Sequence, residues 1–540
     1  MSGLRRLLVA ACLVGGGALA AAPGAVAAGL NWKPCGAAPD SQCATAHVPR
    51  DYDHPNGDKL SIAVAKSPAT GPGKRIGSLF FNFGGPGAFA APYVEFIGHD
   101  LFPKLNERFD IVGMDPRGTD IDLDNENSVD CQTNPERLGI YSEPFTTPFN
   151  LDAGALIRKD QRFIRACLDN SSRKVLGHTS TADVARDMDR MRQAVGDDKL
   201  SYLGFSYGTF LGATYASLFP GKMRAVVLDG PVNANSYINR PMQDLKTQSA
   251  ALERELQRFF MACAADQVNC SGFGGSDPHG AFDDLVEQAN ASPIPAPGYT
   301  SDPRPVKGDD VLGAAFAEMY AKQNWGTLAE ALSDAANRND GSKLRKLVDE
   351  DWYARDPDTG EYDPLNDRYF VLGASEQRYR KGDVGLYLET GEDCWEMFDH
   401  MYVNCGYVEL NYGLWPVRAH DVFRGPFRVP KSAATPLVVD TTYDPATPYR
   451  GGLLLARDLG NARVLTMKGD GHTAYGGNSE CIDTKVEDYL INRVLPPAGT
   501  KCRQEVPFEK PPAEAAKQRS GKQQQAIRQI RPHVRPLVRR

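Results

Sequence analysis

The sequence lacks several features that would assign its 540 residues to a simple class. It contains no C-x-x-C and no H-E-x-x-H pattern, so no familiar zinc motif is present, and we expect neither a metal nor another cofactor. It has no excess of positive charge, because the formal net charge is −7, which argues against a nucleic-acid-binding protein. It has no internal repeat, and beyond its N-terminus no run approaches the roughly 18 to 20 apolar residues of a membrane span.

The N-terminus has the pattern of a secretory signal peptide. Arg5 and Arg6 precede an apolar run at 7–21, and small residues follow with A-x-A-like cleavage sites. We therefore predict that residues 1–28 are removed and that the mature chain is secreted, with no membrane span left. The alternatives are an uncleaved anchor and a lipoprotein linked through Cys12, which would leave apolar residues on the mature protein.

Ten cysteines follow the predicted signal peptide, an even number that suits disulfide bonds in an exported protein. They fall into pairs that are close in sequence, and we predict a bridge within each pair. The pairs are Cys35 and Cys43, Cys131 and Cys167, Cys263 and Cys270, Cys394 and Cys405, and Cys481 and Cys502.

Strand-like segments alternate with segments of helical periodicity. Strands are predicted at 60–65, 76–83, 109–114, 200–204 and 224–228, and helices at 181–195 and 207–219. Such alternation predicts a mostly parallel sheet with helices on its faces. Residues 235–400 interrupt the pattern, with helices predicted at 243–264 and 308–338. The alternation then resumes with strands at 436–441 and 462–467 and a helix at 449–459.

One sheet with an insertion explains this resumption better than two independent domains. We predict an α/β domain in two parts, 29–234 and 401–502, with a mainly helical cap inserted at 235–400. The remaining tail, 503–540, holds ten Lys or Arg and three Asp or Glu. It shows little apolar periodicity, so we expect it to be disordered.

A G-x-S-x-G motif, Gly204 to Gly208, lies between a predicted strand and a predicted helix. The bare motif is weak, but this strand–turn–helix context is that of a nucleophile elbow, where a serine hydroxyl is exposed on a strained turn. The glycines keep side chains away where strand and helix approach closely. We predict that Ser206 is a nucleophile; an ordinary tight turn is the alternative.

A glycine-rich stretch follows the predicted strand at 76–83. Acyl transfer requires backbone N–H groups that stabilise the developing oxyanion, one from such a loop and one from the residue after the nucleophile. We predict that Tyr207 and either Gly84 or Gly85 supply them. A phosphate-binding loop is disfavoured because no Lys-Ser/Thr pair closes the stretch.

The acid and base of a triad in this fold follow the serine in the order acid, then histidine. Asp444 lies on the loop after one late strand, and His472 follows the last clear strand between glycines. We prefer Asp444 to Asp440, which is too close to its strand, and to Asp470, which is too close in sequence to His472. His420 is the fallback base and is expected at the surface.

Asp115 to Gly118 also follow a strand, and we expect them to form a structural turn with an Asp–Arg pair. Five motifs in order then resemble those of the secreted tripeptidyl aminopeptidases, in the prolyl-aminopeptidase-like branch of the α/β-hydrolases. They are Gly-Gly-Pro-Gly at 84–87, Asp-Pro-Arg-Gly at 115–118, Gly-Phe-Ser-Tyr-Gly-Thr at 204–209, Asp-Pro-Ala-Thr-Pro at 444–448 and Gly-His at 471–472.

The resemblance covers most of residues 30–500 and implies a serine exopeptidase that releases short peptides, typically tripeptides, from free N-termini. It places the nucleophile at Ser206, the acid at Asp444 and the base at His472. Phe83 departs from the family pattern, because prolyl aminopeptidases usually have His there. This departure bears on strict proline specificity more than on acyl transfer.

An aminopeptidase must also bind the substrate ammonium, and a shielded carboxylate in the cap would do so. The candidates are Glu389, Glu392, Asp393 and Glu396, although a solvated acidic helix face is the simpler interpretation of each. Two other functions remain open. One is a secreted lipase or esterase of the same fold, which the lack of a long apolar lid disfavours, and the other is a non-catalytic cell-surface binding protein.

Overall fold

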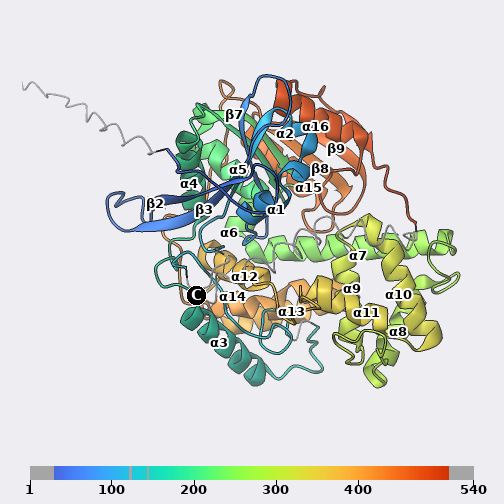
Figure 1. Cartoon of the computed structure of the whole chain (residues 1–540). Helices are drawn as coiled ribbons and strands as arrows, with labels where there is room; N and C mark the ends of the chain where they lie inside the picture. Colours follow the sequence, from blue (N-terminus) through green and yellow to red (C-terminus); the bar gives the residue numbers. More distant parts are fainter. Residues whose placement is uncertain (1–28, 121–124, 143–144, 510–540) are drawn as a thin grey trace, which may run out of the picture.

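The computed structural model describes residues 29–120, 125–142 and 145–509 (Figure 1). The predicted signal peptide at 1–28 and residues 510–540 of the predicted tail lie outside the described residues. Within the described ranges, none of the helices combines the length and the apolar character that crossing a bilayer requires.

A ten-stranded sheet forms the centre of the protein, in the order β1-β2-β3-β5-β4-β6-β7-β8-β9-β10. The strands are β1 (Lys33–Pro34), β2 (Gln42–Pro49), β3 (Lys59–Ser67), β4 (Gly77–Asn82), β5 (Phe109–Met114), β6 (Leu200–Phe205), β7 (Met223–Asp229), β8 (Leu437–Tyr443), β9 (Arg463–Asp470) and β10 (Lys501–Arg503). The pairs β1–β2, β2–β3 and β3–β5 are antiparallel, and all others are parallel. Because parallel strands end at the same edge, loops after β6, β8 and β9 meet there.

Helices cover both faces of the sheet. The flanking helices are α1 (Ala91–Leu101), α2 (Pro103–Asn106), α4 (Thr181–Ala194), α5 (Tyr207–Leu218), α15 (Tyr449–Leu459) and α16 (Glu480–Asn492). Helix α3 (Ala153–Asn170) instead lies next to the segment Leu410–Leu414 (α14), away from the sheet (Figure 1). Neighbouring residues of a central strand point to opposite faces: Tyr202 packs in the core beneath α4, α5 and α15, and Leu203 in the core beneath α1, α2 and α16. The central strands are therefore buried on both sides, which explains their continuous apolar sequences.

A helical insertion separates β7 from β8 and lies below the sheet in Figure 1. Its helices are α6 (Ala234–Asn239), α7 (Pro241–Ala265), α8 (Pro278–Ala291), α9 (Gly308–Glu318), α10 (Trp325–Arg338), α11 (Ser342–Leu347), α12 (Leu365–Glu376), α13 (Val384–Met397) and α14 (Leu410–Leu414). Short 3-10 or π turns are η1 (Pro220–Lys222), η2 (Lys322–Asn324), η3 (Val348–Trp352), η4 (Met401–Asn404) and η5 (Gly406–Glu409). Phe259, Phe282 and Trp325 belong to a second core, formed mainly by the insertion and joined by Phe145 from the first part of the α/β domain.

The α/β fold with a helical insertion is confirmed, but three local features differ from the expectation. The insertion continues past residue 400, because α14 follows and β8 begins only at Leu437. The segment between the predicted helices at 243–264 and 308–338 contains a further helix, α8, which Asp277 caps and which buries Phe282. The chain also stays packed beyond 503, where Arg503 pairs in β10 and Phe508 lies against Trp325.

All five predicted disulfide bonds are present, and each ties together segments that are close in sequence. Three lie outside the insertion, and two, Cys263–Cys270 and Cys394–Cys405, lie within it. Such bonds persist in oxidising compartments, so they suit an extracellular protein.

Candidate active site

Ser206 lies on a sharp turn between β6 and α5. Its backbone has φ 54° and ψ −125°, a conformation that non-glycine residues rarely adopt and that is typical of functional turns. The turn requires the two flanking glycines: a Cβ at Gly204 would overlap the carbonyl oxygen of Gly208, and one at Gly208 would lie 2.6 Å from the carbonyl oxygen of Asn82. The structure therefore has the strand–turn–helix geometry of a nucleophile elbow.

The structure brings Asp444 and His472 together from the loops after β8 and β9. The Nδ1–H of His472 donates to Asp444, whose carboxylate oxygens lie 2.9 and 3.0 Å away. Asp444 is fully buried and also accepts backbone N–H groups from Ala446, Thr447 and Thr473. These bonds fix the carboxylate, and the carboxylate in turn fixes the tautomer and orientation of the imidazole.

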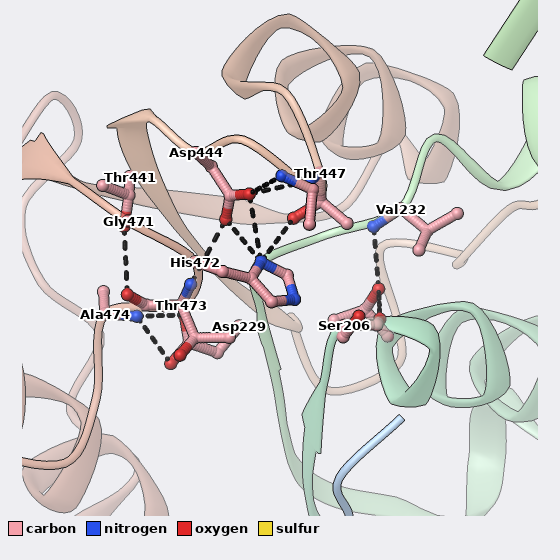
Figure 2. Close-up of polar contacts among 12 residues, drawn as sticks. Ser206, Asp229, Val232, Thr441, Asp444, Thr447, Gly471, His472, Thr473 and Ala474 are labelled. Atoms are coloured by element: carbon pink, nitrogen blue, oxygen red, sulfur yellow. Dashed lines mark hydrogen bonds and ion pairs between the residues drawn. The ribbon is translucent and has the colours of Figure 1, made fainter. Parts of the chain in front are cut away.

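Ser206 and His472 line the same cavity. Figure 2 shows the imidazole between Asp444 and Ser206, with Nε2 on the side of Ser206. This Nε2 is buried and has no hydrogen-bond partner in the part of the chain that the structure describes. It is therefore available to accept a proton from a nucleophile in the cavity.

The electrostatic surroundings favour a charged His472. Burial lowers the pKa of His472, but the charge of Asp444, its hydrogen bond and the charge of Asp229 outweigh burial, so the pKa lies above the ordinary value of 6.5. Asp229 ends β7 and accepts the N–H groups of Ala474 and Tyr475. Burial raises the pKa of Asp229 to about 7.

The alternative acids and base occupy different environments. Asp440 is completely buried, and burial together with Asp444 and Asp229 raises its pKa well above the ordinary value. Asp470 forms ion pairs with Arg258 and Lys322, at 2.5 and 2.9 Å. His420 is exposed, as expected, and does not line the cavity.

Of the three predicted oxyanion donors, Gly85 and Tyr207 line the cavity and Gly84 does not. The N–H of Gly84 donates to the side chain of Asn82 at 3.0 Å, so it is already occupied. Gly84 has a steric role instead, because a Cβ there would lie 2.9 Å from the Cβ of Ser206. The geometry therefore favours Gly85 over Gly84 as the loop donor.

The Asp115–Gly118 turn supports the glycine-rich loop that contains Gly84 and Gly85. Asp115 accepts the N–H groups of Ala90 and Ala91 at 2.7 and 2.8 Å, which fixes the start of α1 next to the glycine stretch. Arg117 pairs with Asp187 of α4, at 2.6 Å, and not with Asp115 as the expected Asp–Arg pair implied. The turn is structural, with its partner on a neighbouring helix.

The cavity has a volume of about 760 Å³ and extends from the carboxyl edge of the sheet into the insertion. Aromatic rings form much of its wall: Tyr141, Phe316, Tyr320, Trp352 and Tyr369. Three carboxylic acids also line it, Asp244, Glu318 and Asp351. The site is thus a cavity between the sheet and the insertion, with several aromatic rings in its wall and acidic groups on the side of the insertion.

The four acids predicted to bind an ammonium group do not line this cavity. They are Glu389, Glu392, Asp393 and Glu396, all exposed on α13. The helix buries the opposite side through Tyr387, Thr390, Gly391 and Cys394, whose spacing turns the acids outward. Asp393 forms an ion pair with Lys246 at 3.1 Å. The structure therefore agrees with the simpler interpretation, a solvated acidic helix face, and does not place these residues where they could bind a substrate ammonium in this cavity.

Asp244, Glu318 and Asp351 are all cavity acids that the sequence interpretation missed, and the last two are neighbours. Glu318 is 2% exposed and ends the apolar helix α9, where it is a lone acid after Ala315 and Phe316. Burial and the neighbouring Asp351 raise the pKa of Glu318 well above the ordinary value. A single acid ending an apolar helix was a usable signal for Glu318, whereas Asp351 lies in an acidic run with no such signal.

Comparison with known proteins assigns the family. Residues 78–272 match the model described as alpha/beta hydrolase fold, and residues 407–502 match the model described as TAP-like protein. Serine protease Hip1 of Mycobacterium tuberculosis is 31% identical over 520 residues, which cover 92% of this chain and 95% of the relative. Carboxylesterase B of the same organism is 31% identical over 477 residues, 86% of each chain. Tripeptidyl aminopeptidase of Streptomyces lividans is 27% identical over 497 residues, covering 88% and 87%.

These matches extend over nearly the whole described chain, including the insertion. They confirm the family resemblance that the five sequence motifs indicated, and they agree with the elbow and the imidazole–carboxylate pair at the edge of the sheet. The chain therefore belongs to the TAP-like branch of the α/β-hydrolase superfamily and is a serine hydrolase.

Proposed function

We propose that this serine hydrolase is a secreted exopeptidase that releases short peptides, in the first instance tripeptides, from free N-termini. The observation that carries the proposal is one cavity with Ser206 and His472 at the sheet and Glu318 and Asp351 at the insertion. A nucleophile at one end and two acids at the other, the buried Glu318 and the half-buried Asp351, suit a substrate with a cationic terminus near its scissile bond. The name of the Streptomyces relative agrees with this proposal.

In the proposed mechanism, the Oγ of Ser206 attacks the carbonyl carbon of the scissile peptide while its proton passes to Nε2 of His472. Asp444 stabilises the imidazolium that forms. The oxyanion accepts hydrogen bonds from the backbone N–H groups of Tyr207 and Gly85. Collapse of the tetrahedral intermediate breaks the C–N bond, and the leaving amine takes the proton from Nε2.

The remaining ester links Ser206 to the N-terminal peptide. A water molecule then attacks this ester and gives its proton to Nε2 of His472. Collapse of the second tetrahedral intermediate returns that proton to Ser206 and releases the peptide as a free acid. Coverage by the insertion limits competing water and strengthens electrostatic interactions in the site.

Glu318 and Asp351 are proposed to bind the substrate ammonium. Glu318 cannot easily ionise beside Asp351, because both its burial and the neighbouring negative charge raise its pKa. An entering ammonium would supply the missing positive charge and favour ionisation. An N-acetylated substrate brings no such charge, so it would bind poorly.

Secretion is proposed from two independent features. The first is the signal-peptide pattern at 1–28, and the second is the set of five disulfide bonds. Both point to an oxidising environment outside the cytoplasm. Mass spectrometry of the N-terminus of the exported protein tests cleavage near residue 28.

The activity is tested by hydrolysis of tripeptide amides that have a free or an acetylated N-terminus, with Ser206→Ala as the inactive control. A strong preference for the free N-terminus supports the exopeptidase. Equal rates on both substrates contradict it. Preferential cleavage of long-chain esters supports the esterase alternative, and no turnover by a folded wild-type chain supports a binding protein.

A further inference from the structure

Two histidines and an aspartate from separate segments converge in the insertion, away from the active-site cavity. They are His279 and Asp283 of α8 and His400, which lies between α13 and η4. One potential ligand atom from each lies within 4.8 Å of the other two. We propose that this cluster is a binding site for a divalent transition metal, with Zn²⁺ the best match, a property that goes beyond the proposed peptidase function.

His400 is held in a fixed orientation. Its side chain is 6% exposed, and Nδ1 lies 2.8 Å from Oε1 of Glu253. The other oxygen of Glu253 accepts the backbone N–H groups of His400 and Met401, at 3.0 and 2.9 Å. A carboxylate behind one imidazole nitrogen, with the other nitrogen directed at the ligand position, is the usual support of a metal-binding histidine.

The rings of Phe260 and Phe282 complete this support. Both pack edge-on against His400, with centroid distances of 6.2 and 5.4 Å. Phe260 also stacks on His279 at 5.2 Å. The two imidazoles are therefore positioned by the same apolar wall, and their own centroids lie 5.4 Å apart.

Asp283 lies between the two imidazoles. Its Oδ1 is 2.8 Å from Nε2 of His400, and its Oδ2 is 3.7 Å from Nε2 of His279. His279 and Asp283 are four residues apart on α8, so they share one helix face. Their side chains are 40% and 55% exposed, which leaves them room to open and admit an ion about 2.0 to 2.2 Å from each ligand.

The donor set selects the metal. Two imidazole nitrogens and one carboxylate oxygen suit Zn²⁺, with a fourth position for water, whereas Ca²⁺ and Mg²⁺ prefer oxygen ligands only. Without a metal, each imidazole lies at a different oxygen of Asp283, at 2.8 Å for His400 and at the longer distance of 3.7 Å for His279. Two protonated imidazoles would repel each other there, whereas one divalent cation uses both as neutral ligands.

The separation of these residues in the sequence explains why no metal-binding motif is visible there. His400 lies more than a hundred residues after His279, and the two meet only because the insertion folds α8 against the segment after α13. A bound ion would join α8 to that segment, and through Glu253 also to α7. We expect binding to stabilise the folded insertion, because the unfolded chain does not hold these ligands together.

The test is calorimetric titration of the metal-stripped full chain with ZnCl2, with thermal unfolding measured in parallel. The wild-type chain is expected to bind one equivalent through this site and to unfold at a higher temperature with Zn²⁺ than without it. Mg²⁺ and Ca²⁺ at the same concentration are expected to give neither effect. Binding of Co²⁺ with the visible absorption of a tetrahedral site would support the geometry.

Two variants locate the site. His279→Phe keeps an aromatic ring against Phe260 but removes the ligand nitrogen, and Asp283→Asn removes the charge. Each variant is expected to lower the affinity for the one Zn²⁺ ion at this cluster about tenfold or more, and to abolish the thermal shift. The matched control, His47→Phe, changes an exposed histidine on β2 and should bind as the wild type does. Failure of the wild-type chain to bind Zn²⁺, or unchanged binding in both variants, overturns the proposal.

Discussion

The backbone N–H of Gly471 donates to Oε1 of Glu255 at 2.8 Å, so a helix of the insertion holds the residue immediately before His472. The next N–H, that of His472 itself, donates to the carbonyl oxygen of Tyr320 at 2.7 Å, again in the insertion. Arg258, one turn along α7 from Glu255, pairs with Asp470. The insertion thus covers the site and also positions the loop of the base.

Replacement of Glu255 tests this support. Burial raises the pKa of Glu255 to about 9, so the side chain is a neutral acid at pH 7, and Glu255→Gln preserves its shape and its acceptor oxygen. We expect Glu255→Gln to keep kcat near the wild-type value. Glu255→Ala leaves the N–H of Gly471 without its partner and should lower kcat by about tenfold or more, measured on a free tripeptide amide. Equal kcat values for the two variants would contradict the positioning role.

The same substitution predicts a change in stability with pH. The folded pKa of about 9 lies above the ordinary value of 4.5, so the protonated acid stabilises the fold fully below pH 4.5. That contribution is lost as the pH rises towards 9, because the unfolded chain ionises first. Since Gln cannot ionise, Glu255→Gln should gain about 1 kcal/mol or more over the wild type between pH 5 and 9, measured by urea unfolding. A difference in the free energy of unfolding between the two proteins that does not change with pH would contradict this prediction.

Removal of the carboxylate of Asp444 should change both the rate of hydrolysis and its pH profile. Asp444→Asn takes away the charge that raises the pKa of His472 and leaves burial, which lowers it. Since the base acts in its neutral form, wild-type kcat/KM should be lost as pH falls through a pKa above 6.5. In the variant, kcat/KM should fall by about 1,000- to 10,000-fold, because the tautomer of His472 is no longer fixed. The midpoint of the remaining pH profile of kcat/KM should move to lower pH. A profile of unchanged midpoint would assign the titration to another group.

Replacement of the cavity acids Glu318 and Asp351 should lower the affinity for substrates with a free N-terminus and not for N-acetylated ones. Glu318→Gln and Asp351→Asn should raise KM for a free tripeptide amide by about 10- to 100-fold, because an ammonium would lose a buried ionic partner. Rates on the N-acetylated amide should change little. Glu389→Gln, on the exposed face of α13, is the matched control and should leave both substrates unaffected. Equal losses on both substrates would indicate a structural role for Glu318 and Asp351.

Local sequence was sufficient for the elements that carry the nucleophile and the base. The strand before Ser206 is mostly apolar and wholly buried, the helix after it is almost wholly buried, and glycines mark the turn between them. The order of motifs was enough to pair Asp444 with His472, because parallel strands bring the loops after β8 and β9 to one edge.

The contacts of the insertion could not be predicted in the same way. Helices of the insertion contact the site through single polar residues, such as Glu255 and Glu318. The other buried residues of those helices are mostly apolar, so the sequence alone does not place these acids in the site. Which face points to the cavity depends on how the helices pack on each other. For this reason the sequence left open whether the acids of α13 face the cavity or solvent, and the cluster of His279, Asp283 and His400 depends on the packing of separate segments.

The buried pair between Arg117 and Asp187 should be a main contributor to stability. Arg117 is completely buried; Nε and Nη2 donate to Asp187 at 2.6 and 2.9 Å, and the guanidinium also donates to the carbonyl oxygens of Pro49 and Arg50. Asp187→Ala leaves this buried cation with only the more distant carboxylate of Asp183, at 3.9 Å, and should lower the free energy of unfolding by about 3 to 5 kcal/mol. The exposed pair of Lys104 and Glu107 is the matched control, and Glu107→Ala should cost less than about 1 kcal/mol. Similar losses for the two variants, measured by urea unfolding, would contradict this role, because the large cost arises only where water cannot replace the missing partner.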